Sequence, residues 1–266
     1  MSRYDAMFAR CRAEGRIAFG GFLMLGHPSI AETPAFLDAL VEGGADMVEL
    51  GIPFSDPVAD GPVIARAGKE ALEAGVTPDD CLDLLADFRA RHPDVPVGIL
   101  TYANIVMARG RTRFAGELAK AGVDSLLVAD VPSFEARPWA ADLVAEGIDP
   151  VLIAAPNTSE AALRTVAAVG RGYTYCVARN GVTGTNVAPT LSHGALFADL
   201  ERLGAPPPVL GFGLSEPDHV RAAAEAGAAG AISGSAIVKR VPDGPGAVRD
   251  FVAAMVRATH YQAALT

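Results

Sequence analysis

The chain has 266 residues, which fits one large domain spanning residues 1–266 better than two small ones. Half of the residues are hydrophobic and 20% are charged, so the chain can bury a sizeable core, and this composition excludes intrinsic disorder. The formal net charge of −9 excludes a generally basic surface for nucleic acid or for an acidic membrane. An anionic ligand would therefore depend on local groups such as backbone amides at helix N-termini.

The cysteines and the N-terminal residues indicate the cellular compartment of the protein. Cys11, Cys81 and Cys176 are an odd number without CxxC spacing, and each lies in an apolar or helical context. We therefore expect reduced core thiols, which are typical of cytoplasmic proteins. The N-terminal residues lack the apolar region of a signal peptide, and no run approaches the roughly 18 apolar residues of a membrane span. The sequence thus predicts a soluble cytoplasmic protein.

One pattern recurs along the chain: a helical stretch ends at glycine, and a short apolar run follows. Glycine past a helix supplies the left-handed residue that ends it, and continuous Val, Ile and Leu runs are typical of strands buried on both faces of a parallel sheet. Eight strands are expected, within residues 18–26, 42–51, 95–103, 120–130, 145–156, 172–178, 207–213 and 225–235.

Helical patterns follow these strands, and an additional helix is expected at the N-terminus. The patterns cover residues 32–42, 78–91, 111–121, 134–146, 159–169, 194–203, 217–226 and 245–258. Unbroken alternation of strands and helices predicts an α/β fold, a (β/α)₈ TIM barrel, with an open doubly wound sheet as the alternative.

Two long connections interrupt the regular spacing. Residues 51–75 follow the second strand and become helical in their second half, whereas residues 179–193 follow the sixth strand and are rich in glycine and threonine. Both connections follow the carboxyl ends of strands, where barrel enzymes build their active sites. We expect both to act as lids.

Glu49 lies inside the apolar run Met-Val-Glu-Leu of the second strand. A buried carboxylate is costly unless it is paired or protonated. It is either a structural glutamate with a neighbouring donor or a general acid/base with a raised pKa, and the barrel context favours the second interpretation.

Aspartates after the second and fourth strands have both structural and functional interpretations. Asp56 and Asp60 stand beside proline and glycine, which is ordinary turn chemistry, but Asp60 could fold over Glu49 and supply a second carboxylate. Asp130 ends the fourth strand and is expected to tie loop amides rather than to contact a ligand.

Glycines end the last two strands, at Gly213 and at Gly234 with Ser235. Barrels commonly bind phosphate with backbone amides of the loops after strands seven and eight, although such glycines can also serve only as tight turns.

Other chemistries are disfavoured by residue placement. The three lysines, Lys69, Lys120 and Lys239, fall in helical stretches, which argues against a Schiff base at a strand end. The five histidines show no metal-ligand spacing, so no metal site is expected.

Several stretches resemble the α chain of tryptophan synthase. They are VELGIPFSDPVADGPVI (48–64), VGILTYANIV (97–106), GVDSLLVADVP (122–132), RGYTYCVARNGVTG (171–184) and GFGLSEPDHV…GAISGSAIVK (211–239). The resemblance implies a TIM barrel that cleaves indole-3-glycerol phosphate to indole and D-glyceraldehyde 3-phosphate by a retro-aldol reaction. It implies no cofactor in this chain, because pyridoxal phosphate belongs to the β subunit that receives the indole.

The resemblance also implies roles for individual residues. Glu49 would protonate indole C3 and remove the glycerol hydroxyl proton, and Asp60 would accept a hydrogen bond from the indole N–H. The indole cavity would be lined by Phe22, Leu100, Leu127, Ala129, Ile153, Tyr175, Thr183, Phe212 and Ile232. Backbone amides would hold the phosphate at Gly184, Gly213, Gly234 and Ser235, and Thr183 would meet Asp60 as the lid closes.

The family docks its β subunit through loops after strands two, three and four. The corresponding residues here are Pro53, Asp56, Pro57, Tyr102, Asn104 and Pro132, which favours an α₂β₂ assembly. A stand-alone lyase that releases free indole is the alternative, and a weak regulatory subunit is a third. Met24 and His27 depart from the family's usual residues and leave the ligand preference open.

Overall fold

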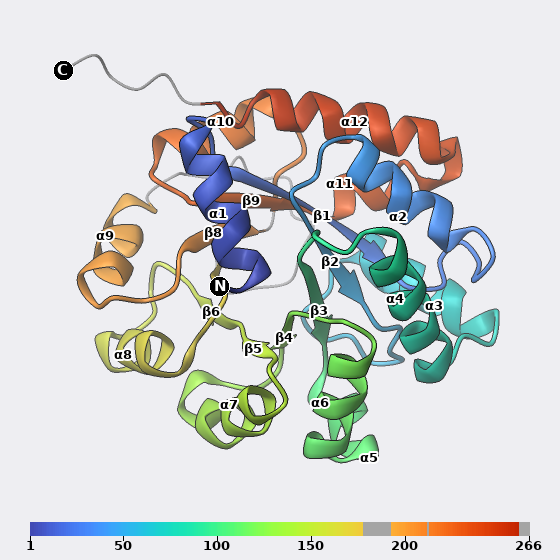
Figure 1. Ribbon diagram of the computed structural model, residues 1–266, viewed down its shortest axis with the longest axis horizontal. Helices are drawn as coiled ribbons and strands as arrows, with labels where there is room; N and C mark the ends of the chain where they lie inside the picture. The colour runs from blue at the N-terminus through green and yellow to red at the C-terminus, as the bar shows by residue number, and fades with distance from the viewer. Residues whose placement is uncertain (178–192, 212, 261–266) are drawn as a thin grey trace.

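Parallel strands alternate with helices along the chain in the computed structural model, which describes residues 1–177, 193–211 and 213–260 (Figure 1). The strands are β1 (Ala18–Met24), β2 (Met47–Gly51), β3 (Val97–Thr101), β4 (Ser125–Val128), β5 (Asp149–Pro150), β6 (Leu152–Ala154), β7 (Thr174–Val177), β8 (Pro208–Gly211) and β9 (Gly230–Ser233). They form one sheet in the order β5-β4-β3-β2-β1-β9-β8-β7-β6. The expected TIM barrel is confirmed.

The fifth expected strand, within 145–156, is divided into β5 and β6. The amide of Val151 donates to the carbonyl of Leu126 (3.0 Å) toward β4, whereas the carbonyl of Pro150 accepts from Arg171 (2.9 Å) on the side of β7. Because proline has no N–H, pairing with β7 begins only at Leu152. The run 149–154 still joins the two edges of the sheet and closes the barrel.

The helices surround the barrel (Figure 1). They are α1 (Arg3–Ala13), α2 (Thr33–Glu42), α3 (Pro62–Glu73), α4 (Pro78–Arg91), α5 (Ala103–Arg109), α6 (Arg111–Lys120), α7 (Ala136–Ala145), α8 (Glu160–Val169), α9 (Gly194–Arg202), α10 (Pro217–Glu225), α11 (Ser235–Val238) and α12 (Pro245–Arg257). Short 3₁₀ turns cover Ser133–Glu135 and Val241–Asp243. Gly44, Gly122 and Gly227 have positive φ just past helices, as the recurring pattern predicts.

Helix α5 was not expected from the sequence. The prediction extended the third strand to residue 103, but the strand ends at Thr101 and Ala103 begins α5. Gly110, with φ 82°, separates α5 from α6, and Ile105 and Val106 are buried under the short helix. The predicted strand is therefore about two residues too long, and the residues after it form a short helix with Ile105 and Val106 on its buried side.

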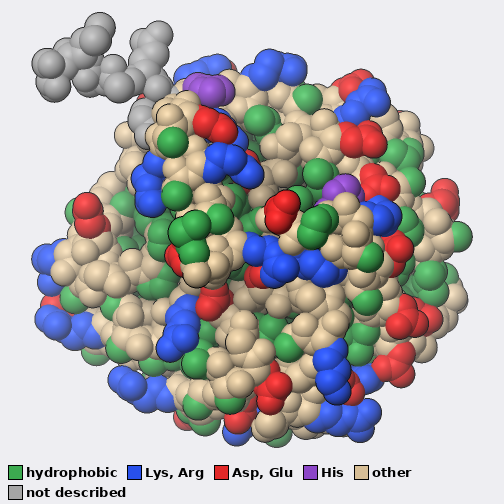
Figure 2. Space-filling view, viewed as in Figure 1, with side chains coloured by type: hydrophobic (Ala, Val, Ile, Leu, Met, Phe, Trp, Pro, Cys, Tyr) green, Lys and Arg blue, Asp and Glu red, His purple; other side chains and the backbone are tan. Residues whose placement is uncertain are grey.

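Helix α1 lies across one end of the barrel, as expected for the additional N-terminal helix (Figure 1). Ser2 caps the helix in a capping box with Asp5. The side of the helix that faces the barrel carries the buried residues Tyr4, Met7, Phe8 and Cys11. The Tyr4 hydroxyl reaches into the barrel and hydrogen-bonds Ser125 Oγ at 2.8 Å. Figure 2 shows Lys and Arg interspersed with Asp and Glu on this face.

Two further sequence predictions concern the thiols and the membrane. Cys11, Cys81 and Cys176 are free and buried, as expected. In the part of the chain that the structure describes, no helix is long and apolar enough to cross a membrane. The cytoplasmic location stays a prediction.

Candidate active site

Glu49 points into the barrel from β2, between Phe22 of β1 and Gly98 of β3 in the strand register. The side chain is 2% exposed, and the Tyr173 hydroxyl donates a 3.0 Å hydrogen bond to its Oε1. Burial raises the pKa of Glu49 to about 8; the Tyr173 hydrogen bond opposes this shift, and the charge of Asp60 adds to it. Glu49 therefore carries a proton at neutral pH and can donate it.

Asp60 lies on the connection between β2 and α3. Burial raises the pKa of Asp60 to about 6, and a hydrogen bond from the Tyr102 hydroxyl opposes the shift. The same hydroxyl accepts from the amide of Ala59 at 3.2 Å, and the Tyr102 ring stacks on Phe54 with 5.3 Å between centroids. Asp60 is therefore mostly ionised at neutral pH, beside a protonated Glu49.

Tyr173 and Tyr102 are the site residues whose roles the sequence did not reveal. The alternation of side chains along a strand places Tyr173 on the same inward face as Tyr175, so the sequence could show that it enters the barrel. The neighbouring residues could not show that its hydroxyl meets Glu49. Tyr102 was expected at a partner interface, yet its side chain is 2% exposed and holds the Asp60 loop. Its contact with a partner stays a prediction.

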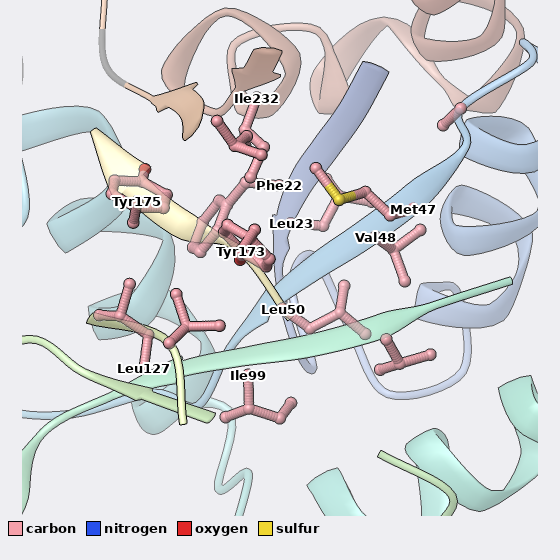
Figure 3. Close-up of a cluster of buried hydrophobic side chains, with 14 of the residues drawn as sticks. Phe22, Leu23, Met47, Val48, Leu50, Ile99, Leu127, Tyr173, Tyr175 and Ile232 are labelled. Carbon is pink, nitrogen blue, oxygen red and sulfur yellow. The ribbon is translucent and has the colours of Figure 1, made fainter. Parts of the chain in front are cut away.

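Apolar side chains surround the two carboxyls. Phe22, Leu127, Tyr175 and Ile232 are buried and extend from β1, β4, β7 and β9 into the common interior (Figure 3). Leu100, Ala129 and Ile153 are partly buried against the same core. Thr183 and Phe212 lie outside the described residues.

Glycines on the inward faces of the strands make room for the site. A Cβ on Gly211 would lie 2.2 Å from Cζ of Tyr175, and one on Gly98 would lie 2.9 Å from Ser125 Oγ. A Cβ on Gly51 would lie 2.8 Å from Cζ of Phe22. Any larger residue at these positions would displace a side chain of the site.

The loops after β8 and β9 lie next to each other, as a shared phosphate site requires. The Ser233 hydroxyl donates to the carbonyl of Leu214 at 2.6 Å and joins the two loops. Gly213 is exposed with φ 77°, and Gly234 directly precedes Ser235, the first residue of α11. Gly184 lies outside the described residues.

Two other sequence predictions can be placed. Asp130 accepts a 2.8 Å hydrogen bond from the amide of Ala103, so it ties a backbone amide as expected, but this amide begins helix α5 and does not belong to a loop. Within residues 1–177, 193–211 and 213–260, no group of three or more His, Cys, Asp or Glu side chains could hold a metal ion.

The fold and the site define a (β/α)₈ barrel with a buried carboxyl group, Glu49, and a partly buried one, Asp60, set among apolar side chains near the carboxyl ends of the strands. Residues 8–264 match the family described as tryptophan synthase alpha chain. The chain belongs to this family.

Individual relatives agree with the family match. A tryptophan synthase alpha chain of Shewanella amazonensis is 52% identical over 241 residues, which is 91% of each chain. One from Vibrio cholerae is 50% identical over 239 residues, covering 90% of this chain and 89% of the relative. A solved chain of tryptophan synthase from Mycobacterium tuberculosis superposes with a TM-score of 0.90 at 31% identity, over 98% of this chain and 99% of that one.

Proposed function

We propose that this chain cleaves indole-3-glycerol phosphate to indole and D-glyceraldehyde 3-phosphate by a retro-aldol reaction. The observation that carries the proposal is the pair of carboxyls: the buried Glu49, with a pKa raised to about 8, and the partly buried Asp60, with a pKa raised to about 6. Neighbouring carboxyl groups with separated pKa values supply one proton donor and one anion at the same pH. Membership of the tryptophan synthase alpha chain family supports this choice of substrate.

The two carboxyls account for each proton in the reaction. Glu49 donates its proton to indole C3, and the ring becomes a positively charged indolenine whose N–H binds the ionised Asp60. The Glu49 carboxylate then takes the proton of the adjacent glycerol hydroxyl. The bond from C3 to the glycerol carbon breaks, its electrons restore the indole, and the hydroxyl carbon becomes the aldehyde. The Tyr173 hydroxyl holds Glu49 in one orientation.

The rest of the substrate fits groups around the carboxyls. We assign the flat indole ring to the apolar interior, which includes Phe22, Leu127, Tyr175 and Ile232. The phosphate would accept hydrogen bonds from the amides of Gly184, Gly213, Gly234 and Ser235. Proton transfer between carboxyls and substrate needs no cofactor in this chain, and pyridoxal phosphate would belong to the β subunit.

A β subunit of tryptophan synthase is the proposed partner, in an α₂β₂ assembly. Asp56, Asn104 and Pro132 are exposed, and each follows one of the adjacent strands β2, β3 and β4. On the connection after β2, Pro57 is partly buried and Pro53 is buried. Large apolar side chains beside them are also exposed: Val58 at 69%, Met107 at 55% and Phe134 at 77%. Apolar side chains gathered on one side of the molecule are typical of protein interfaces.

Replacing Phe134 by Ser should weaken binding to the β subunit by about tenfold or more, because aromatic anchors carry much of the energy of such interfaces. Calorimetric titration with purified β subunit measures the dissociation constant. Arg202→Ser, on α9 at the opposite side of the barrel, is the control and should bind like the wild type. Equal affinities for Phe134→Ser and the wild type would place the interface elsewhere.

Indole release from indole-3-glycerol phosphate, by the chain alone and with a β subunit, tests the proposed function. We expect slow release alone and a marked acceleration with the β subunit. Fast release that ignores the β subunit would identify a stand-alone lyase. An absence of release in both cases, with the β subunit nevertheless activated, would identify a regulatory subunit and refute the proposal.

A further inference from the structure

Helix α3 determines where Asp60 stands. Asp60 is followed by Gly61, the N-cap residue, and by Pro62, the first residue of α3. The amide of Asp60 donates to the carbonyl of Pro57 at 3.1 Å, so the carboxylate is held in a tight turn at the start of the helix. A shift of α3 against the barrel therefore moves Asp60 relative to Glu49, which is carried by β2.

Helix α3 packs on the barrel through apolar contacts of mostly small residues. Its buried residues are Ile64, Ala67, Gly68 and Ala71, of which three are small. A Cβ on Gly68 would lie 3.4 Å from Cε of Met24, the last residue of β1. Such contacts bring the helix close to the strand, but hydrophobic packing is non-directional and specifies no single hydrogen-bonded register.

His27, in the loop after β1, supplies a directional contact. Its Nε2 lies 3.1 Å from Oε2 of Glu70 on α3, and a carboxylate can only accept, so Nε2 donates. Among the residues that the structure describes, this is the one side-chain hydrogen bond that joins α3 to another element. Glu70 also accepts from Arg66 of the same helix at 2.7 Å, which orients its carboxylate.

Among the described residues, Glu70 is the one hydrogen-bond partner of the His27 imidazole. His27 is 8% exposed, and its Nδ1 is buried without a hydrogen-bond partner in the described part of the chain. The preceding residue, Gly26, has φ +77°, and a Cβ there would lie 2.5 Å from Cγ2 of Val76. The loop backbone therefore approaches the segment after α3 as closely as glycine allows, and this brings the ring to Glu70.

We propose that His27 is a positioning residue for Asp60: by anchoring Glu70 it holds α3, and with it the Asp60 carboxylate, in register with Glu49. This inference rests on the proposed retro-aldol function. Tyr102 holds Asp60 from the end of β3, and His27 holds it through α3 from the end of β1.

A double-mutant cycle tests the inference. His27→Ala should lower kcat for indole release about tenfold with little change in KM, because Asp60 acts mainly in the transition state. In the Asp60→Asn background, His27→Ala should cause no further loss of kcat. Equal losses from His27→Ala in both backgrounds would overturn the inference.

Companion variants separate positioning from general destabilisation. His27→Gln should keep most of the wild-type kcat, because its amide nitrogen can still donate to Glu70. If His27→Ala does not fold, Glu70→Ala takes its place in the cycle and should lower kcat by the same factor. Lys69→Gln is the control with unchanged turnover, because Lys69 is 74% exposed on α3 and pairs with Glu73 rather than with Glu70. A wild type that releases no indole would overturn the proposed function and this inference together, whereas an active wild type with unaffected Glu70→Ala would overturn this inference alone.

Discussion

Replacing Glu49 by Gln is expected to reduce kcat for indole-3-glycerol phosphate cleavage on the order of 10³-fold, within the range for a general acid–base group. Gln has nearly the same shape, and its carbonyl can still accept the Tyr173 hydrogen bond. Substrate binding should therefore survive while proton donation to C3 is lost. Single-turnover indole release measures the chemical step, and titration with substrate measures binding. Undiminished turnover would remove Glu49 from the mechanism.

The stability of Glu49→Gln provides a check that does not depend on activity. The unfolded chain releases the Glu49 proton near pH 4.5, whereas the folded chain keeps it until about pH 8. Folding stability from this group is therefore fully present below pH 4.5 and is lost as pH rises to about 8. Gln does not ionise, so the variant should be more stable than the wild type at pH 8, by a few kcal/mol in order of magnitude. Denaturant unfolding at pH 5 and pH 8 should show this difference only at the higher pH.

Asp60→Asn should lower kcat on the order of 10²-fold and change KM much less, because the anion stabilises the positive indolenine of the transition state. Asn retains an oxygen that can accept from Tyr102 and from the indole N–H, so the charge alone is removed. Steady-state indole release gives both constants. A large rise in KM with unchanged kcat would make Asp60 a ground-state binding group instead.

The pH profile of kcat/KM sharpens the Asp60 prediction. In the wild type kcat/KM should fall below about pH 6, because Asp60 gains a proton, and above about pH 8, because Glu49 loses its proton. In Asp60→Asn the acid limb should disappear. The alkaline limb should move to lower pH, because the charge that helps to raise the Glu49 pKa is gone. Glu73→Gln, 65% exposed on α3, is the matched control and should keep both limbs.

Local patterns were sufficient to predict alternating strands and helices and to single out Glu49 as a candidate. Apolar runs after helix-ending glycines predict buried parallel strands, because a strand covered on both faces accepts few polar side chains. Glu49 departs from that rule within its own strand, so it is visible without any knowledge of the fold. Asp60 does not stand out in the same way, because aspartate beside proline and glycine also makes turns.

The sequence by itself determined the alternation of strands and helices, the free buried cysteines and the candidate role of Glu49, since each depends on neighbours within a few residues. It favoured a closed barrel over an open sheet, but closure was decided by the tertiary structure, in which the run 149–154 pairs with β4 and with β7. The tertiary structure decided which distant side chains meet: Tyr173 lies 124 residues from Glu49 in sequence, and His27 lies 43 residues from Glu70. It also decided that Pro150 divides the fifth strand and that Ala103 begins a helix. The meetings of distant side chains depend on contacts between separate elements, which no local spacing encodes, and the pKa values of Glu49 and Asp60 follow from burial in the folded barrel.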